Sequence, residues 1–233
     1  MDLKNAKILI TGGSLGIGKA TAKVLVDRGA HVGITGRDAS RLKIAATDTG
    51  AFPITADVAE SGDITRTYDE FMGKFDGLDC LINNAGIGAF KKLDETETED
   101  FERVFAVNVF GAARMAARAV EIFKKSGGGN IINIGSTAAE KGFEGGSIYA
   151  ASKFALRGMT QCWQAELRRH DIRVMLIDPS EVATAFANSD RVEREAPANK
   201  LTSYEIAHAI ASVLEMDNRG MIPELAVWAT NPW

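Results

Sequence analysis

Tyr149 and Lys153 stand four residues apart in a long helical pattern of the sequence. On a helix this spacing puts the two side chains on the same face, roughly 6 Å apart along the axis. An unperturbed phenol has a pKa of about 10 and is a poor acid-base catalyst at neutral pH, but a neighbouring cation favours its ionised form. The pair could therefore move a proton, with Tyr149 as the acid-base group and Lys153 as the cation. Such pairs also occur as ordinary surface residues, so the spacing alone does not decide.

A glycine-rich turn, Thr11–Gly18, joins an apolar run to a helical pattern that begins at Ile17. Gly12, Gly16 and Gly18 recur in it, and glycine suits a phosphate site because it allows positive φ and lets a pyrophosphate approach the backbone. The free N–H groups that open the helix would face that anion. The turn therefore predicts a nucleotide site, although ordinary tight turns also use glycine.

Apolar runs and helical patterns alternate along the chain, as expected of repeated β-α-β units. The predicted strands are 6–10, 31–35, 52–55, 78–83, 130–136, 173–178 and 221–229. The predicted helices are 17–28, 38–48, 61–75, 96–125, 149–170 and 202–215, and capping boxes open two of them, at Thr96 with Glu99 and at Thr202 with Glu205. Because parallel crossovers are right-handed and both sheet faces need cover, this pattern predicts an α/β fold, a doubly wound parallel sheet of Rossmann type with about seven strands and helices on both faces.

One domain should span residues 1–233, because this length and a hydrophobic content of 45% suit one core. Ser136 ends the fifth predicted strand and Tyr149 begins the next helix, so both should project from the carboxyl edge of the sheet, where ligands of such folds bind. The irregular stretch 181–201 also follows this edge. It is a candidate substrate loop, with a plain surface loop as the alternative.

Composition and charge exclude several other classes of function. The formal net charge is −4 and no basic run occurs, which argues against nucleic acid as a partner. No apolar run is long enough to span a bilayer and no signal segment precedes the first strand, so the sequence predicts a cytoplasmic protein without a membrane partner. The histidines are scattered and lack ligand spacing, which argues against a metal site. Cys80 and Cys162 each lie in an apolar segment and are expected to be buried, reduced thiols.

Several short motifs, taken in order, resemble the short-chain dehydrogenase/reductase family over essentially the whole chain. They are the turn Thr11–Gly18, the segment Asn83-Asn84-Ala85-Gly86, Asn108, Ser136, Tyr149, Lys153 and the segment from Pro179 to Thr184. The resemblance implies direct hydride transfer between a nicotinamide and a carbonyl or secondary alcohol carbon, without a metal. It also implies that Ser136 orients the substrate oxygen and that Tyr149 gives or takes its proton. Lys153 would grip the nicotinamide ribose, and Asn108 would hold a relay water behind it.

The same resemblance implies the residues of the cofactor site. They are Gly12, Ser14, Leu15, Gly16, Ile17, Gly18, Arg37, Asp57, Val58, Asn84, Ala85, Gly86, Tyr149, Lys153, Pro179, Val182 and Thr184. Asp57 would approach the adenine, while Val182 and Thr184 would hold the nicotinamide amide. Plainer interpretations remain open, because Asn-Asn-Ala-Gly is a good turn sequence and Asp57-Val58 could cap the next helix. Ser180 stands where the family has glycine, so a positive φ at this position would strain it.

The end of the second predicted strand bears on the choice between NAD and NADP. This strand leads into Thr35-Gly36-Arg37, where folds of this type place an acidic residue on the ribose 2′-hydroxyl of NAD. A small residue followed by a guanidinium leaves room for a 2′-phosphate and attracts it. The sequence therefore predicts a preference for NADP(H). Asp38 and the non-basic Leu15 keep NAD(H) as the alternative cofactor.

The predicted function is an NADP(H)-dependent oxidoreductase that acts on a small-molecule carbonyl or alcohol. The alternative is a nucleotide-sensing regulatory protein that keeps the fold without turnover. Gly88, Ala89, Phe90 and Phe143 are expected to shape the substrate pocket. They do not choose among acyl thioesters, small ketones, pterins and sugars, although the sequence also resembles 3-oxoacyl-carrier-protein reductases.

The two long predicted helices, 96–125 and 149–170, carry more apolar side chains than one sheet can cover. Small residues among large ones permit close helix packing across a two-fold axis. The resemblance likewise implies pairing through these helices, with the last strand and the tail from Trp228 joining dimers. We expect a homotetramer, otherwise a homodimer; the alternative is a monomer that leaves these side chains partly exposed.

Overall fold

Seven parallel strands form one sheet in the order β3-β2-β1-β4-β5-β6-β7. The structure is a computed structural model that describes residues 1–186, 192–193 and 195–231. The strands are β1 (Lys7–Ile10), β2 (His31–Gly36), β3 (Phe52–Thr55), β4 (Cys80–Asn83), β5 (Gly129–Ile134), β6 (Ile172–Pro179) and β7 (Glu224–Val227). The strand order reverses between β1 and β4, and ligands of such folds bind beyond the carboxyl ends at this point. The predicted doubly wound α/β fold is confirmed.

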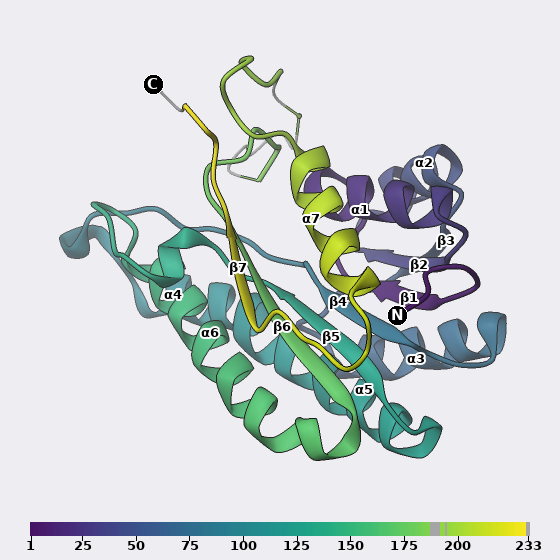
Figure 1. Cartoon of the computed structure of the whole chain (residues 1–233). Helices are drawn as coiled ribbons and strands as arrows, with labels where there is room; N and C mark the ends of the chain where they lie inside the picture. Colours follow the sequence, from purple (N-terminus) through teal and green to yellow (C-terminus); the bar gives the residue numbers. More distant parts are fainter. Residues whose placement is uncertain (187–191, 194, 232–233) are drawn as a thin grey trace.

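Helices cover both faces of the sheet (Figure 1). One layer consists of α1 (Gly16–Asp27), α2 (Ala39–Thr49) and α7 (Ser203–Glu215), and the other of α3 (Ser61–Phe75), α4 (Thr98–Phe105), α5 (Ala112–Ser126) and α6 (Ser147–Leu167). Successive residues of β1 serve different layers, because Ile8 and Ile10 pack into the first core and Leu9 into the second. Burial on both sides explains why these strands are almost continuously apolar.

Most predicted elements lie where local sequence patterns placed them. Strand β3 and helix α3 coincide with the predicted ranges 52–55 and 61–75. The capping box that opens α7 is confirmed, since the Thr202 hydroxyl accepts the Tyr204 N–H and the Thr202 N–H donates to Glu205. The last strand is shorter than predicted and covers Glu224–Val227 instead of 221–229.

The prediction of one continuous α-helix over 96–125 is wrong. Helix α4 passes into a π-helical segment, Ala106–Gly111, before α5 begins. The cap also differs, because the Asp100 carboxylate accepts the Glu97 N–H while the Thr96 hydroxyl donates to the Leu93 carbonyl. A π-helical insertion depends on packing around it and often lies at a functional site, so the helical periodicity of the sequence does not reveal it.

The two cysteines occupy different environments. Cys80 is buried in β4, where burial raises the pKa of its thiol, but Cys162 is exposed on α6, so the prediction of burial is wrong for Cys162. Over the described ranges, no helix combines the length and hydropathy that crossing a bilayer requires. Residues 187–191 and 194 of the predicted substrate loop, and 232–233 of the predicted tetramer tail, lie outside the described residues.

Candidate active site

A cavity of about 440 Å³ lies at the carboxyl edge of the sheet, where the turn before α1 meets the ends of β2, β4, β5 and β6. The predicted site residues that line it are Gly12, Ser14, Leu15, Gly16, Ile17, Arg37, Asp57, Val58, Asn84, Ala85, Gly86, Ser136, Tyr149, Lys153, Pro179, Val182 and Thr184. Gly18 and Asn108 are the two predicted residues outside this lining. The fold therefore brings residues from the whole length of the chain to one cleft, because parallel strands all end at the same edge.

The glycine-rich turn has the backbone shape that a phosphate site needs. Gly12 and Gly16 have positive φ angles of 68° and 55°. Gly18 allows close packing, because a Cβ on it would lie 2.4 Å from the Gly12 carbonyl oxygen. The Gly16 N–H donates to a carboxylate oxygen of Glu193 at 2.7 Å. An anionic oxygen thus lies at the N-terminus of α1, where the turn predicts a phosphate oxygen.

Asn84 and Thr11 join the end of β4 to this turn. The Asn84 side-chain amide donates to the carbonyl oxygens of Thr11 and Gly12, at 2.9 Å each. The Thr11 hydroxyl in turn accepts the N–H groups of Asn84 and Ala85, at 3.0 Å each. These bonds satisfy polar groups that line the cleft, and they hold the floor of the cleft against the turn.

Two arginines stand beside the cleft where β2 leads into α2. Arg37 lies 3.6 Å from Asp57, and Arg41 lies 3.2 Å from Asp38. Asp38 also accepts the Arg41 N–H and thereby caps α2. The sequence analysis missed Arg41, although its place in the first turn of a helix that begins at the cleft was a usable signal. This end of the cleft therefore carries two guanidinium groups close to two carboxylates.

Asn108 lies in the π-helical segment and is almost completely buried. Its amide oxygen accepts the Ile87 N–H at 2.9 Å, while its NH₂ group donates to the Ile87 carbonyl at 2.9 Å and to the Ser152 hydroxyl at 3.0 Å. These partners remove the cost of a polar side chain in the helix interior. The side chain connects the loop after β4 to α6, one residue before Lys153.

Lys153 reaches the end of β5 from the first turns of α6. The residue is 5% exposed, and its Nζ donates to the Ile134 carbonyl at 2.7 Å and lies 5.7 Å from the centre of the Tyr149 ring. Burial lowers the pKa of Lys153 to about 8, because a charged amine loses its hydration, although Asp178 acts in the opposite direction. The predicted pairing of Tyr149 and Lys153 on one helix face is present.

Burial also raises the pKa of the Tyr149 phenol. A hydrogen bond with the Ser136 side chain lowers this pKa and the Asp178 charge raises it, but burial has the largest effect. The net shift is therefore opposite to the one predicted from a neighbouring cation. A phenol with a raised pKa is protonated at neutral pH, so Tyr149 is ready to act as an acid.

The predicted strain at Ser180 is absent. Among the described non-glycine residues, positive φ occurs only at Asn5, Asp76 and Asp171. The Ser180 N–H donates to the Val227 carbonyl at 2.9 Å, so the segment after β6 continues the pairing with β7. Serine is therefore compatible with this backbone.

Asp178 is a buried carboxyl group directly behind Ser136, and the sequence analysis did not single it out. One of its oxygens accepts the Ser136 N–H at 2.8 Å, and a Cβ on Gly135 would lie 2.0 Å from that oxygen, so only glycine fits there. The other oxygen has no hydrogen-bond partner among the described residues. Burial raises the pKa of Asp178 to about 6, and the nearby Glu224 and Glu140 carboxylates add to the shift.

Asp178→Asn is expected to stabilise the protein at neutral pH. Burial raises the pKa of this carboxyl from 3.8 to about 6, which means that the folded state favours the protonated form. The contribution of the protonated Asp178 to the stability of the fold is therefore complete below pH 4 and is lost as the pH rises through 6. Asparagine keeps the acceptor for the Ser136 N–H without the charge. Melting curves should show a gain on the order of 2 kcal/mol, or roughly 4–8 °C, at pH 8 and little difference at pH 4.

A matched control for this prediction is Asp94→Asn, which changes an exposed carboxyl on the loop after β4. Its melting temperature should follow that of the wild type at both pH values. A melting temperature of Asp178→Asn that equals the wild-type value at pH 8 would contradict the assigned cost of the buried charge.

Comparison with known proteins extends these observations. A sequence profile of the short chain dehydrogenase family matches residues 6–195. Carbonyl reductase family member 4 of Xenopus tropicalis is 32% identical over 88% of this chain and 89% of its own. A 3-ketoacyl-(acyl-carrier-protein) reductase from Brucella melitensis complexed with NADH has a TM-score of 0.90 at 27% identity, covering 99% of this chain and 100% of that one. An alcohol dehydrogenase from Thermococcus sibiricus complexed with 5-hydroxy-NADP has a TM-score of 0.88 at 26% identity, covering 97% of each chain.

The region matched by the profile extends from β1 into the loop after β6 and includes the glycine-rich turn, Ser136, Tyr149 and Lys153. Both of the solved structures named above hold a nicotinamide dinucleotide or a derivative of one, which supports a cofactor of this class. Residues of the glycine-rich turn, Ser136, Tyr149 and Lys153 all line the cleft of the present structure. The chain therefore belongs to the short-chain dehydrogenase/reductase family of NAD(P)-dependent oxidoreductases.

Proposed function

We propose that this protein is an NADP(H)-dependent oxidoreductase that interconverts a carbonyl and a secondary alcohol, with Tyr149 as the acid-base group. The observation that carries the proposal is the meeting of Ser136, Tyr149 and the buried Lys153 in one corner of the cleft. A bound nicotinamide would supply or accept the hydride. The protein would supply the proton and the hydrogen bonds at the substrate oxygen.

Each member of this corner has a distinct role in the proposal. The raised pKa of Tyr149 keeps its phenol protonated, so in the reducing direction it can donate a proton to the oxygen that gains negative charge. The Ser136 hydroxyl would donate a hydrogen bond to the same oxygen. Lys153 keeps one N–H on the Ile134 carbonyl, which leaves two for the ribose and for stabilising a phenolate.

The remaining predicted residues would hold the cofactor. The turn from Gly12 to Gly18 would bind the pyrophosphate, and Asn84, Ala85 and Gly86 would line the adenosine side. Asp57 and Val58 would contact the adenine, whereas Pro179, Val182 and Thr184 would contact the nicotinamide. Asn108 would support a proton relay behind Lys153, and its side-chain bonds to Ile87 and Ser152 fix the backbone there.

Arg37→Ala is expected to weaken NADPH binding about 10-fold or more while changing NADH binding little. A guanidinium at the end of β2 would form charge-assisted hydrogen bonds with the 2′-phosphate, and such bonds contribute roughly 1.5–3 kcal/mol. NADH lacks this phosphate. Fluorescence titration with each cofactor measures the Kd values for NADPH and NADH and their ratio. The control is Arg219→Ala, which changes an exposed arginine far along the chain. Equal use of NADH and NADPH by the wild type would refute the preference.

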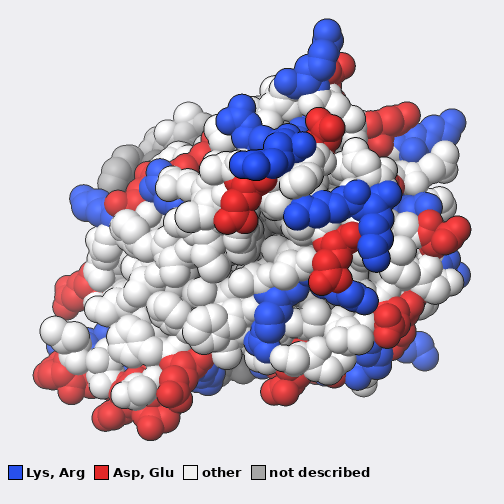
Figure 2. Space-filling view, turned by 90° about the horizontal axis from the view of Figure 1, so that it is seen from below, with Lys and Arg blue, Asp and Glu red and all other residues white. Residues whose placement is uncertain are grey.

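The partners proposed for this enzyme are small molecules and further copies of the chain. On the face seen in Figure 2, Lys and Arg side chains are interspersed with Asp and Glu and form no separate basic field, which supports a partner other than nucleic acid. Phe110 is exposed on the π-helical segment that precedes α5, and Phe154 and Cys162 are exposed on α6. Trp228 is exposed after β7. These apolar surfaces favour assembly.

We propose a homotetramer, otherwise a homodimer, joined through the layer of α5 and α6. Light scattering at micromolar concentration should give a tetramer mass for the wild type. Phe154→Glu should lower that mass, because it puts a charge into the proposed interface. Tyr204→Glu, at an exposed aromatic position on α7 outside the proposed interface, is the control and should leave the mass unchanged. A wild-type monomer would contradict the proposal.

A further inference from the structure

Three phenylalanine rings form one cluster with Tyr149. Phe186 lines the cavity, whereas Phe90 and Phe143, which the sequence predicted to shape the substrate pocket, lie next to it and outside its lining. The rings of Phe90 and Phe186 each lie 5.5 Å from the Tyr149 ring, and Phe143 lies 6.2 Å from Phe90. They come from three separate loops, which follow β4, β5 and β6. Phe90 is 47% exposed and Phe143 is 49% exposed, so a large apolar surface faces solvent beside the proposed acid-base group.

The backbone fixes the positions of these rings. A Cβ on Gly88 would lie 2.7 Å from the Phe90 ring, and a Cβ on Gly146 would lie 2.6 Å from the Phe143 ring. Each glycine therefore makes room for one aromatic ring. The Lys91 N–H donates to the Gly145 carbonyl at 3.0 Å and joins the two loops that carry Phe90 and Phe143. The pair of rings is thus a built wall and not a chance contact of two loose side chains.

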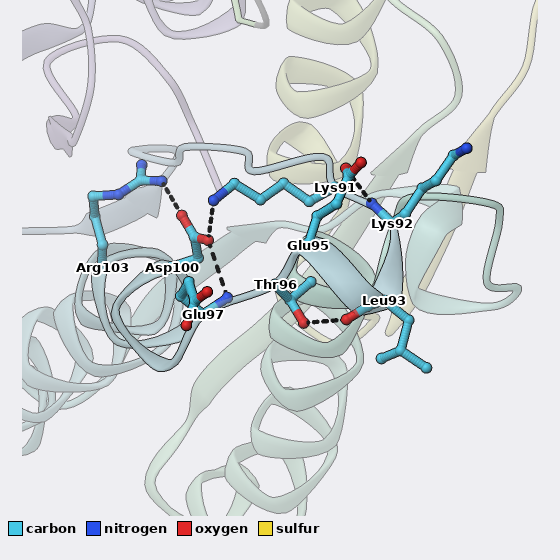
Figure 3. A network of polar contacts seen from close by, with 8 residues as sticks. All are labelled: Lys91, Lys92, Leu93, Glu95, Thr96, Glu97, Asp100 and Arg103. Carbon is cyan, nitrogen blue, oxygen red and sulfur yellow. Dashed lines mark hydrogen bonds and ion pairs between the residues drawn. The ribbon is translucent and has the colours of Figure 1, made fainter.

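The positive charge of Lys91 beside Phe90 is neutralised by a carboxylate at the start of α4. The ammonium of Lys91, the residue after Phe90, lies 2.5 Å from the Asp100 carboxylate, which also pairs with Arg103 at 3.3 Å (Figure 3). These ion pairs lower the pKa of Asp100 and hold the start of α4 against the loop. Lys91 is therefore committed to Asp100, and the four rings present one polar group, the Tyr149 hydroxyl.

We propose that the substrate is an aryl ketone, or the matching aryl secondary alcohol, whose flat apolar ring packs against Phe90, Phe143 and Phe186 while its oxygen reaches Tyr149. This inference rests on the proposed function of the same site. In reduction the carbonyl carbon gains a hydride from NADPH and the oxygen gains the Tyr149 proton, so the products are the aryl alcohol and NADP⁺, and solvent returns a proton to Tyr149.

Aromatic geometry distinguishes this substrate class from saturated rings and from sugars. Offset or edge-to-face ring contacts add stabilisation beyond the burial of area alone, so an aryl group gains more here than a saturated ring of equal size. The hydroxyl groups of a sugar would face phenyl surfaces and lose their hydrogen bonds to water. A flat apolar ring is the chemistry that this wall accepts best.

The test compares three ketones with NADPH: acetophenone, its saturated counterpart cyclohexyl methyl ketone, and dihydroxyacetone. We expect kcat/KM for acetophenone to be at least about 5-fold above that for the cyclohexyl ketone and higher still relative to dihydroxyacetone. Phe90→Leu and Phe143→Leu should each raise KM for acetophenone several-fold and leave that for the cyclohexyl ketone nearly unchanged. Leu93→Ala is the control, because Leu93 is 79% exposed on the same loop and points away from the Lys91 network (Figure 3).

If kcat/KM for cyclohexyl methyl ketone or for dihydroxyacetone equalled that for acetophenone, the inference would be overturned and the proposed function would stand. The inference would also be overturned if Phe90→Leu and Phe143→Leu kept the wild-type ratio of the KM values for acetophenone and cyclohexyl methyl ketone. A second measurement does not depend on turnover: 1-phenylethanol should raise the melting temperature of the protein saturated with NADP⁺ more than 1-cyclohexylethanol does. Equal shifts in melting temperature with the two alcohols would overturn the proposed substrate class. If the proposed function itself were wrong, the protein would neither bind nor oxidise NADPH.

Discussion

Tyr149→Phe is expected to lower kcat by a factor on the order of 10² or more and to leave the Kd for NADPH within about twofold of the wild-type value. The substitution removes only the hydroxyl that would pass the proton. The ring keeps its contacts with Phe90 and Phe186, so the wall of the cleft is preserved. Stopped-flow or steady-state oxidation of NADPH measures kcat, and quenching of protein fluorescence measures Kd.

Tyr204→Phe is the matched control for this experiment, because Tyr204 is an exposed tyrosine on α7. It should retain wild-type kcat. The direction of the reaction gives a further check, since burial raises the pKa of Tyr149. Reduction, which needs the phenol, should be constant at neutral pH and fall at high pH, whereas oxidation, which needs the phenolate, should rise with pH. Near wild-type turnover of Tyr149→Phe would exclude the proposed acid-base role.

Lys153→Ala should lower kcat by a similar factor and, unlike Tyr149→Phe, should also raise the Kd for NADPH about 10-fold. One buried ammonium is proposed to serve both the ribose and the phenol, and its 2.7 Å bond to the Ile134 carbonyl fixes its position. Lys153→Met separates charge from packing, because methionine fills much of the same space without a charge. Lys125→Ala, at the exposed end of α5, is the control.

The lowered pKa of Lys153 also predicts how the activity changes with pH. The pKa of Lys153 is lowered to about 8, so the cation is present below pH 8 and is lost as the pH rises through that value. The rate of carbonyl reduction, which does not need the phenolate, should therefore fall as the pH rises through about 8 in the wild type. This fall should be missing in the residual reduction by Lys153→Met. If Lys153→Met kept both the wild-type Kd and the wild-type kcat, the double role of Lys153 would be wrong.

The identity of the family and the architecture could be read from local features of the sequence. Strands buried on both faces are short apolar runs, and amphipathic helices such as α3 repeat every three to four residues, so both leave a local pattern. The glycine-rich turn and the four-residue spacing of Tyr149 and Lys153 are local as well. Because all strands are parallel, their carboxyl ends meet, and this topological rule alone brought Ser136 and Tyr149 to the cleft.

Other features of the site depend on contacts between residues that are far apart in the sequence. The π-helical segment is held by bonds from Asn108 to Ile87 and Ser152, and the periodicity of one helix carries no trace of such partners. The sign of the Tyr149 pKa shift was predicted from the cation on its own helix, whereas the shift follows from burial by other elements.

Asp178 shows the same division between local pattern and tertiary contact. The sequence gives only a carboxyl group in an apolar strand, but the approach of β5 makes it the acceptor for Ser136. Burial, with a smaller contribution from neighbouring carboxylates, raises its pKa. Three loops also had to converge before Phe90, Phe143 and Phe186 formed one wall. Periodicity and turn chemistry therefore determined the fold, and the resemblance to the family supplied the proposed catalytic residues. Burial, charge proximity and loop convergence, which exist only in the folded chain, decided the electrostatics of the cleft and the arrangement of the rings beside Tyr149.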